Sequence, residues 1–333
     1  MLTYKKSGVD IKGANIFKSK IKALVRKSFR PEVLKDIGGF GSFFKMPSGY
    51  REPVMVSSSD GVGTKLAVAN LINKHDTVGI DAVAMNVNDI LCTGAETLFF
   101  LDYIAFSLVK EQVLVDVVKG INDGCIESGC SLIGGETAQM PGMYRPGEYD
   151  IAGFCVGVVE RGNIIDGSKI EAENVIIGLE SSGAHSNGYS LIRKVFSQKE
   201  LKRMGKELIT PTRIYVKPVL SLLSTKDSRL SINGIANITG GAFYDKISRI
   251  LPDNVNARIF RNSWPVPKIF KLVQNKGNIA DHEMYHTLNM GIGMVLMVEK
   301  SAAKNIIAKL AQLKLKSWII GEITKGNKET EII

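Results

Sequence analysis

Two aspartates and a glycine turn form the most chemically suggestive pattern in this chain. Asp60 opens the segment Asp60-Gly61-Val62-Gly63-Thr64-Lys65, and Asp89 closes Asn86-Val87-Asn88-Asp89. Carboxylate oxygens are ligands that Mg²⁺ prefers, and protein-bound Mg²⁺ commonly accompanies a polyphosphate. Glycines let backbone N–H groups approach phosphate oxygens, because no Cβ stands in the way. The pattern predicts a site for Mg²⁺ and phosphate, and the alternative is an ordinary Asp-Gly turn.

A strand and a helix must position these two carboxylates. Residues 53–59 predict a short buried strand that ends at the Asp-Gly turn. Asp60 would then lie just past the strand, where open α/β sheets bind ligands. Asp89 falls in a predicted helix over residues 76–92, beside Asn88. Two polar side chains in an apolar helix need partners. A coordinated metal ion is one partner that would satisfy Asp89. The alternative is hydrogen bonding to the backbone of a loop.

A third carboxylate follows a predicted short strand at residues 130–133. That strand is expected to end at Gly134-Gly135 and to lead into a long loop through Tyr144. Glu136 is at the start of the loop. We therefore include Glu136 with Asp60 and Asp89 as a candidate metal ligand.

Two further turns precede predicted helices in the second half. They are His185-Ser186-Asn187-Gly188 and Thr239-Gly240-Gly241. A helix N-terminus offers free N–H groups and a positive dipole end, which suit an anion. The alternative is plain helix capping by Ser186 or Asn187. His185 could transfer a proton near neutral pH, or could simply be exposed or hydrogen-bonded.

The overall charge has two interpretations. The chain has 333 residues with 43 basic and 33 acidic side chains, so its net charge is +10. The densest basic run spans residues 18–30 and has apolar residues at helical spacing, which predicts an amphipathic helix with a solvated basic face. That face could instead steer phosphorylated substrates. The run lacks the repeated aromatic interleaving that stacks bases, so we expect no nucleic-acid partner.

The sequence also predicts where the protein works. It shows no N-terminal apolar segment of the secretory kind, and its longest apolar runs are far shorter than the roughly 18 residues that span a membrane. The four cysteines lack zinc spacing and have apolar surroundings, as expected for buried thiols in a reducing compartment. We expect a cytoplasmic protein without a membrane partner.

Strands and helices alternate along the chain, which predicts an α/β protein. Asp166-Gly167-Ser168 suggests a boundary, so we expect two domains, residues 1–168 and 169–333. Each is expected to be a mixed sheet covered by helices. In the second domain, residues 187–204 and 211–224 each predict a helix. The common nucleotide motifs GxxxxGK[ST] and GxGxxG are absent, so any nucleotide site must belong to a less common fold.

Segments along the whole chain resemble one enzyme family, the phosphoribosylformylglycinamidine cyclo-ligases, or AIR synthetases, of purine biosynthesis. In the first half the matching segments are Tyr4-Lys5, Gly8-Val9-Asp10, Arg30-Pro31-Glu32-Val33, Gly38-Gly39-Phe40-Gly41, Asp60 to Lys65, His75 to Asp81, Val87-Asn88-Asp89, Phe99 to Tyr103, Gly134 to Thr137, Met140 to Tyr144 and Ala152 to Glu160. In the second half they are His185 to Leu191, Pro211 to Lys217, Thr239-Gly240-Gly241, Glu283-Met284-Tyr285 and Asn289 to Met294.

The resemblance implies an ATP-dependent ring closure. ATP phosphorylates the amide oxygen of formylglycinamidine ribonucleotide, and an amidine nitrogen of the same molecule attacks the resulting iminophosphate. Aminoimidazole ribonucleotide, ADP and phosphate are the products. The second step is intramolecular, so positioning and exclusion of water are the main tasks of such an enzyme.

The resemblance also implies roles for residues. Asp60, Asp89 and Glu136 would hold Mg²⁺, while Lys65 and the backbone of Gly61, Val62, Gly63 and Thr64 would contact the ATP phosphates. The glycines Gly38, Gly39 and Gly41 would form a flap over the nucleotide, although a loose loop is the alternative. The ribose phosphate of the substrate would bind at Ser186, Asn187 and Gly188 and at Thr239, Gly240 and Gly241. His185 and Lys65 are candidate catalytic residues. A homodimer through the first domain's sheet would extend the site across subunits.

Some positions depart from the family pattern. Ser58-Ser59 stands where Gly-Thr is usual, Gln139 where Glu is usual, Ala184 where Pro is usual and Ala242 where a third Gly is usual. Gln139 cannot act as an acid. Selenophosphate synthetase and thiamine-monophosphate kinase share the carboxylate, Mg²⁺ and ATP layout and are the competing assignments. The chain has no cysteine before Cys92, which counts against the former.

Overall fold

The first domain is built on a four-stranded mixed sheet. A computed structural model describes residue 8 and residues 11–224 and 231–333, with the side chains from residue 13 on. Strands β1 (Pro53–Gly61), β2 (Glu96–Phe106), β3 (Ser131–Gln139) and β4 (Tyr149–Glu160) lie in the order β1-β4-β2-β3. The β2–β3 pair is parallel, and the pairs that β4 makes are antiparallel.

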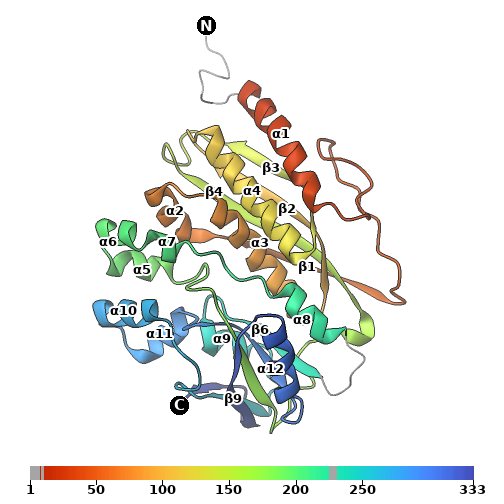
Figure 1. The fold of residues 1–333 in the computed structure, drawn as a ribbon, viewed down its shortest axis with the longest axis vertical. Coiled ribbons are helices and arrows are strands. Elements are labelled where there is room, and N and C mark those ends of the chain that lie inside the picture. Colours follow the sequence, from red (N-terminus) through yellow and green to blue (C-terminus); the bar gives the residue numbers. More distant parts are fainter. Residues whose placement is uncertain (1–7, 9–10, 225–230) are drawn as a thin grey trace.

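Helices cover one face of this sheet (Figure 1). They are α3 (Asp76–Leu91) and α4 (Glu111–Ser128), with α1 (Ile11–Val25) packed on α4. Gly79 and Gly120 allow α3 and α4 to pack closely, because a Cβ at Gly120 would lie 1.7 Å from the carbonyl oxygen of Asp76. This close contact fixes α3 over β1 and β4, the strands nearest the candidate site.

The second domain is a six-stranded mixed sheet. Its strands are β5 (Val175–Glu180), β6 (Ile232–Asn237), β7 (Val255–Ile259), β8 (Ile292–Val298), β9 (Ser317–Lys325) and β10 (Thr330–Ile332), in the order β10-β7-β9-β5-β8-β6. The β10–β7 pair is parallel and the other pairs are antiparallel. The fold class expected from the sequence is confirmed. The predicted boundary at residue 168 lies between β4 and β5 and stays a prediction.

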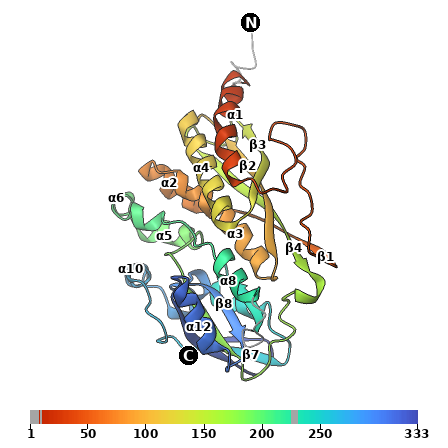
Figure 2. The same ribbon diagram turned by 45° about the vertical axis from the view of Figure 1, so that its right-hand side comes forward.

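Alternate residues of β5 enter two different cores. Ile177 and Leu179 pack with α8 (Val216–Leu223) and α12 (Ala303–Gln312) in a core that continues into the first domain. Ile176 faces the opposite core, with α5 (Tyr189–Val195), α9 (Ala242–Ser248), α10 (Lys268–Gly277) and α11 (Asp281–Thr287). Helix α8 therefore lies between the first-domain helices and the second sheet (Figures 1 and 2).

Polar side chains of α3 hold one segment of the second domain in place. Asp81 is fully buried, and its Oδ1 accepts hydrogen bonds from the backbone N–H and hydroxyl of Thr212 at 2.7 and 2.6 Å. Two turns along the helix, Asn88 bonds the carbonyl of Arg213 and the N–H of Tyr215. These bonds satisfy polar groups of a backbone segment without regular secondary structure, so residues 212–215 are held against α3.

A buried lysine completes this contact. Lys65 ends the short 3₁₀ helix η2 (Gly63–Lys65), just before α2 (Leu66–Ile72), and its side chain is fully buried. Its Nζ lies 2.7 Å from Asp81 Oδ2 and donates to the Thr210 carbonyl at 2.8 Å. Burial lowers the pKa of Lys65, and the charge of Asp81 opposes that shift.

Several predicted boundaries were wrong for identifiable reasons. Asp60 lies within β1. Strand β3 continues through Gly134-Gly135 to Gln139 and includes Glu136, so the carboxylates of Asp60 and Glu136 both belong to strands. The predicted helix 187–204 is interrupted after Val195, where Ser197 and Glu200 form a capping box that starts α6 (Gln198–Arg203), followed by α7 (Gly205–Leu208). The predicted helix 211–224 begins only at Val216, because Asp81 and Asn88 bind backbone groups of Thr212, Arg213 and Tyr215 before the helix starts.

No helix within the described ranges is long and apolar enough to cross a membrane.

Replacing Asp81 with alanine should strongly destabilise the protein. The change leaves the Lys65 charge buried without its partner, and removing one member of a buried pair costs about 3–5 kcal/mol. Urea unfolding followed by circular dichroism should show this loss. Asp123→Ala is the control, because it breaks the exposed Lys119–Asp123 pair on α4, which should change stability by less than about 1 kcal/mol. Equal unfolding midpoints for the two variants would contradict the importance of the buried pair.

Candidate active site

Asp60 and Asp89 lie on elements that pack together, β1 and α3, and Asp89 reaches the interface with the second domain through Asn237. Asp60 pairs with Gly153 across β1 and β4, on the sheet face that α3 covers. Asn86 of α3 donates a hydrogen bond from Nδ2 to the Asp60 carbonyl at 3.3 Å. Burial raises the pKa of Asp89, and the nearby charge of Asp60 raises it further. Two carboxylates that repel each other in this way suit a bound cation.

Unpaired amide oxygens lie beside these carboxylates. Asn86 Nδ2 donates to the carbonyls of Ala82 and Asp60, and Asn237 Nδ2 donates to Asp89 Oδ1 at 2.8 Å. The Oδ1 atoms of Asn86 and Asn237 are buried, and neither finds a hydrogen-bond partner in the described part of the chain. All these groups are oxygen donors of the kind that Mg²⁺ takes, so the residues present fit this ion.

Glu136 lies apart from this pair, which corrects the expectation of three converging carboxylates. Glu136 lies on β3 and pairs with Tyr103 of β2. The row of paired residues across the sheet runs Gly61, Ala152, Tyr103, Glu136. This row points to the uncovered face, and β3 is three strands from β1, about 14 Å away. Within the described ranges, no group of three or more Asp, Glu, His or Cys side chains could hold a metal ion.

The Gly38–Gly41 loop also lies at the far edge of the sheet. Its base is a bridge between Val33 and Phe44, and Ser42 Oγ bonds the carbonyl of Ile133 at the start of β3. Phe40 at its tip is fully exposed. Because β1 is the opposite edge strand, the loop does not cover Asp60 of its own chain.

The glycine turn after Asp60 offers fewer phosphate contacts than expected. The Gly61 N–H bonds Asp60 Oδ1 at 2.7 Å, and the Val62 N–H bonds the Ile151 carbonyl at 3.2 Å. Gly63 and Thr64 open η2, where first-turn N–H groups lack helical partners. Lys65 cannot contact a nucleotide in this arrangement, because its buried Nζ is held by Asp81 and Thr210.

The two glycine turns of the second domain meet. A Cβ on Gly240 would lie 3.5 Å from Asn187 Oδ1. Gly188, with φ of 78°, occupies the N-cap position of α5, while the Ser186 hydroxyl is 3.0 Å from that of Thr212. The Asn187 amide nitrogen is buried without a partner among the described residues, so this turn keeps a free donor.

Acidic charge distinguishes the two turns. Asp245 covers Gly241, since a Cβ there would lie 2.3 Å from its carboxylate. A neighbouring carboxylate disfavours a phosphate on Gly241 itself and favours the turn at Asn187 and Gly188. Ala242 also has a positive φ, of 40°, which is the conformation that the glycine usual at this position would adopt without strain.

His185 is a poor candidate for proton transfer. Its side chain is 1% exposed, and its Nε2 accepts hydrogen bonds from the backbone N–H groups of Ser182 and Arg213 at 3.2 and 3.5 Å. Burial lowers its pKa to about 3, and the charges of Lys65 and Arg213 add to this effect. The imidazole is therefore neutral at physiological pH and serves as an acceptor for the backbone.

The uncovered face of the first sheet is unusually apolar. Met55, Tyr103 and Phe154 are 49%, 43% and 41% exposed, and all three project from the face that carries Glu136. Exposed large apolar side chains gathered on one sheet face are a feature of interaction sites.

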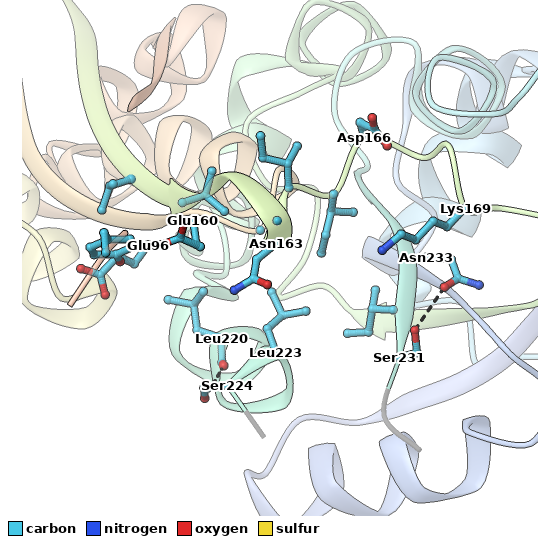
Figure 3. A pocket seen from close by; sticks show the side chains of 18 residues that line it. Glu96, Glu160, Asn163, Asp166, Lys169, Leu220, Leu223, Ser224, Ser231 and Asn233 are labelled. Atoms are coloured by element: carbon cyan, nitrogen blue, oxygen red, sulfur yellow. Dashed lines mark hydrogen bonds between the residues drawn. The ribbon is translucent and has the colours of Figure 1, made fainter. Parts of the chain in front are cut away.

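A large cavity lies away from all of these groups. It has a volume of about 660 Å³ and includes Val158 and Val159, which pair with Met55 and Val54. These strand positions are about 15–20 Å from Asp60. Figure 3 shows Glu96 and Glu160 on one side of the cavity and Lys169, Ser231 and Asn233 on the other. None of the site residues predicted from the sequence lines it.

Comparisons with known proteins decide the family. Residues 50–159 match the N-terminal domain, and residues 171–333 the C-terminal domain, of AIR synthase related proteins. A phosphoribosylformylglycinamidine cyclo-ligase of Pseudothermotoga lettingae is 52% identical over 335 residues, which cover 98% of both chains. The chain belongs to the phosphoribosylformylglycinamidine cyclo-ligase family. A cyclo-ligase of Geobacter metallireducens is likewise 52% identical, over 100% of this chain and 98% of its own.

The cyclo-ligase assignment separates the chain from relatives that share only its fold. The thiamine-monophosphate kinase of Stenotrophomonas maltophilia K279a superimposes with a TM-score of 0.66 over 94% of both chains, but only 16% of residues are identical. This likeness supports the two-domain fold and says nothing of the reaction.

No site role was predicted from the sequence for Asp81, Asn86 or Asn237. Asp81 and Asn86 belong to the same apolar helix as Asp89, and their polarity was the available signal. Asn237 could not be singled out, because only the folded chain places the end of β6 against α3.

Acid should destabilise the wild type more than a His185→Gln variant. The folded protein holds His185 neutral, whereas the unfolded chain protonates it near pH 6.5, so its contribution is present above pH 6.5 and is lost as the pH falls toward 3. Between pH 7.5 and 5.5 the wild type should lose about 1 kcal/mol more than the variant, measured by urea unfolding at both values. Parallel losses would show that His185 titrates normally.

Proposed function

We propose that this chain catalyses the ATP-dependent closure of formylglycinamidine ribonucleotide to aminoimidazole ribonucleotide. Membership of the cyclo-ligase family over the full chain carries the proposal. The paired carboxylates and the glycine turns at the domain interface supply groups that suit the two phosphorylated reactants. We also expect this reaction in the cytoplasm, since purine synthesis uses soluble intermediates.

Asp60 and Asp89 are the proposed Mg²⁺ ligands, with amide oxygens of Asn86 and Asn237 beside them. Mg²⁺ bound there would neutralise charge on the ATP phosphates. The N–H groups of Gly63 and Thr64 follow Asp60 closely in the chain and open η2, and they would meet phosphate oxygens.

The substrate's ribose phosphate is proposed to bind at Asn187 and Gly188. The Asn187 amide nitrogen is buried without a partner among the described residues, and Asn187 Oδ1 would lie 3.5 Å from a Cβ on Gly240, in the turn that follows β6. Asn237 ends β6 two residues before Thr239, so the proposed phosphate and metal positions adjoin. The amide oxygen of the substrate would thus meet the terminal phosphate of ATP at the interface, where proximity favours the reaction.

A homodimer through the uncovered sheet face is part of this proposal. Met55, Tyr103 and Phe154 would be buried by a second copy, and Glu136 lies on the same face. A facing copy would give Glu136 and the Gly38–Gly41 loop a role in the partner's site, which they cannot have in their own chain.

Asp60→Asn and Asp89→Asn should each lower turnover at least tenfold, equivalent to about 1.4 kcal/mol of barrier. Each change removes one charge that would hold Mg²⁺, and product formation from ATP, Mg²⁺ and formylglycinamidine ribonucleotide is the measurement. Asp123→Asn on the outer side of α4 is the control and should keep full activity. Wild-type turnover in both site variants would exclude the assignment, and no product from the wild type would exclude the function.

Phe154→Glu should dissociate the proposed dimer. The change introduces a charge at the centre of the apolar face, where burial would be costly. Light scattering after gel filtration should give half the mass of the wild type. Ile126→Glu on α4 is a matched control, because both wild-type side chains are 41% exposed. A wild type that is already monomeric would refute the proposed interface.

A further inference from the structure

Asn237 joins the second domain to the carboxylate pair of the first. It is the last residue of β6 and is 5% exposed. Its Nδ2 donates to Asp89 Oδ1 at 2.8 Å, across the domain interface. Asp89 is therefore oriented by a residue that lies 148 positions away in the chain.

The orientation of the Asn237 amide is fixed by chemistry. If the amide were rotated, its oxygen would face the Asp89 carboxylate, and two acceptors would repel each other. The nitrogen must face Asp89, so the oxygen is left as a buried acceptor. The described residues provide it with no donor.

An unpaired buried acceptor costs free energy unless something satisfies it. Asn86 presents a second such oxygen from α3, with both of its N–H groups engaged by carbonyls. Lys246 and Arg249 influence Asp89 only through space, and neither makes an ion pair with it within the described ranges. The two unpaired amide oxygens therefore still lack a hydrogen-bond donor or a positive charge among the described residues, and they lie next to two carboxylates.

We propose that Asn237 extends the cation site across the domain interface, so that a divalent cation bound at Asp60 and Asp89 ties the two domains together. This inference rests on the metal site of the proposed function. The Asn237 amide oxygen faces the cation directly or through one of its water ligands, and its N–H group holds Asp89 in the binding orientation. Cation binding and docking of the second domain then stabilise each other by the same factor.

Mn²⁺ alone, without nucleotide, is the probe that tests this. Isothermal titration calorimetry should show that Asn237→Ala weakens Mn²⁺ binding by about tenfold or more, the usual effect of losing a group that orients a ligand. Asn233→Ala is the matched control. Asn233 lies on the same strand and is also buried, but it bonds Asn174, so its loss should leave Mn²⁺ affinity within about twofold of the wild type.

A second measurement follows the domain linkage. Mn²⁺ should slow amide hydrogen exchange in β6 and in residues 239–241 of the wild type, and this protection should disappear in Asn237→Ala. Asn237→Asp should fold and show a larger rise in melting temperature with Mn²⁺ than the wild type, because it places a further carboxylate at the site.

The outcomes separate the two proposals. Unchanged affinity in Asn237→Ala, with weakened binding in Asp89→Asn, would overturn the role of Asn237 and keep the metal site. Unchanged affinity in both variants would overturn the metal site itself, and the role of Asn237 with it. Protection of the second domain that persists in Asn237→Ala would overturn the linkage.

Discussion

The arrangement of this protein depends on one buried ion pair. Lys65 and Asp81 are both excluded from solvent, and together they bind the backbone of residues 210–212. Because a buried charge without its partner is very costly, this pair tolerates few alternative positions of the second domain. The candidate site lies beside it on the same helix, so its geometry follows from this constraint.

Helix α3 serves both structure and chemistry. Asp81 and Asn88 hold the second domain, while Asn86 and Asp89 face the strand end that carries Asp60. The glycine contact between α3 and α4 fixes this helix against the sheet. A helix that is apolar at most positions can thus present a few polar groups accurately, because it cannot shift without breaking its packing.

The sequence predicted the fold well, since strand and helix patterns are local, and the pairing of Asp60 with Asp89 at one metal site stays a prediction. It failed where distant contacts decide. Lys65 follows a glycine turn as a phosphate-binding lysine would, yet Asp81 and Thr210 claim it. Glu136 follows two glycines that suggested a loop, but pairing with β2 extends the strand and turns Glu136 to the other face. No sequence pattern singled out Asn237, because its role depends on its hydrogen bond to Asp89 in the other domain.

The core that β5 shares with the first domain limits how this architecture can diverge. Val175, Ile177 and Leu179 pack together with residues of α3, α4 and α8 rather than within a separate unit. Apolar surfaces of the two halves meet in this core. Removing one half would therefore expose buried apolar side chains of the other and promote aggregation. Recombination between relatives should therefore exchange surface loops more readily than whole halves, and the two halves should accumulate changes together.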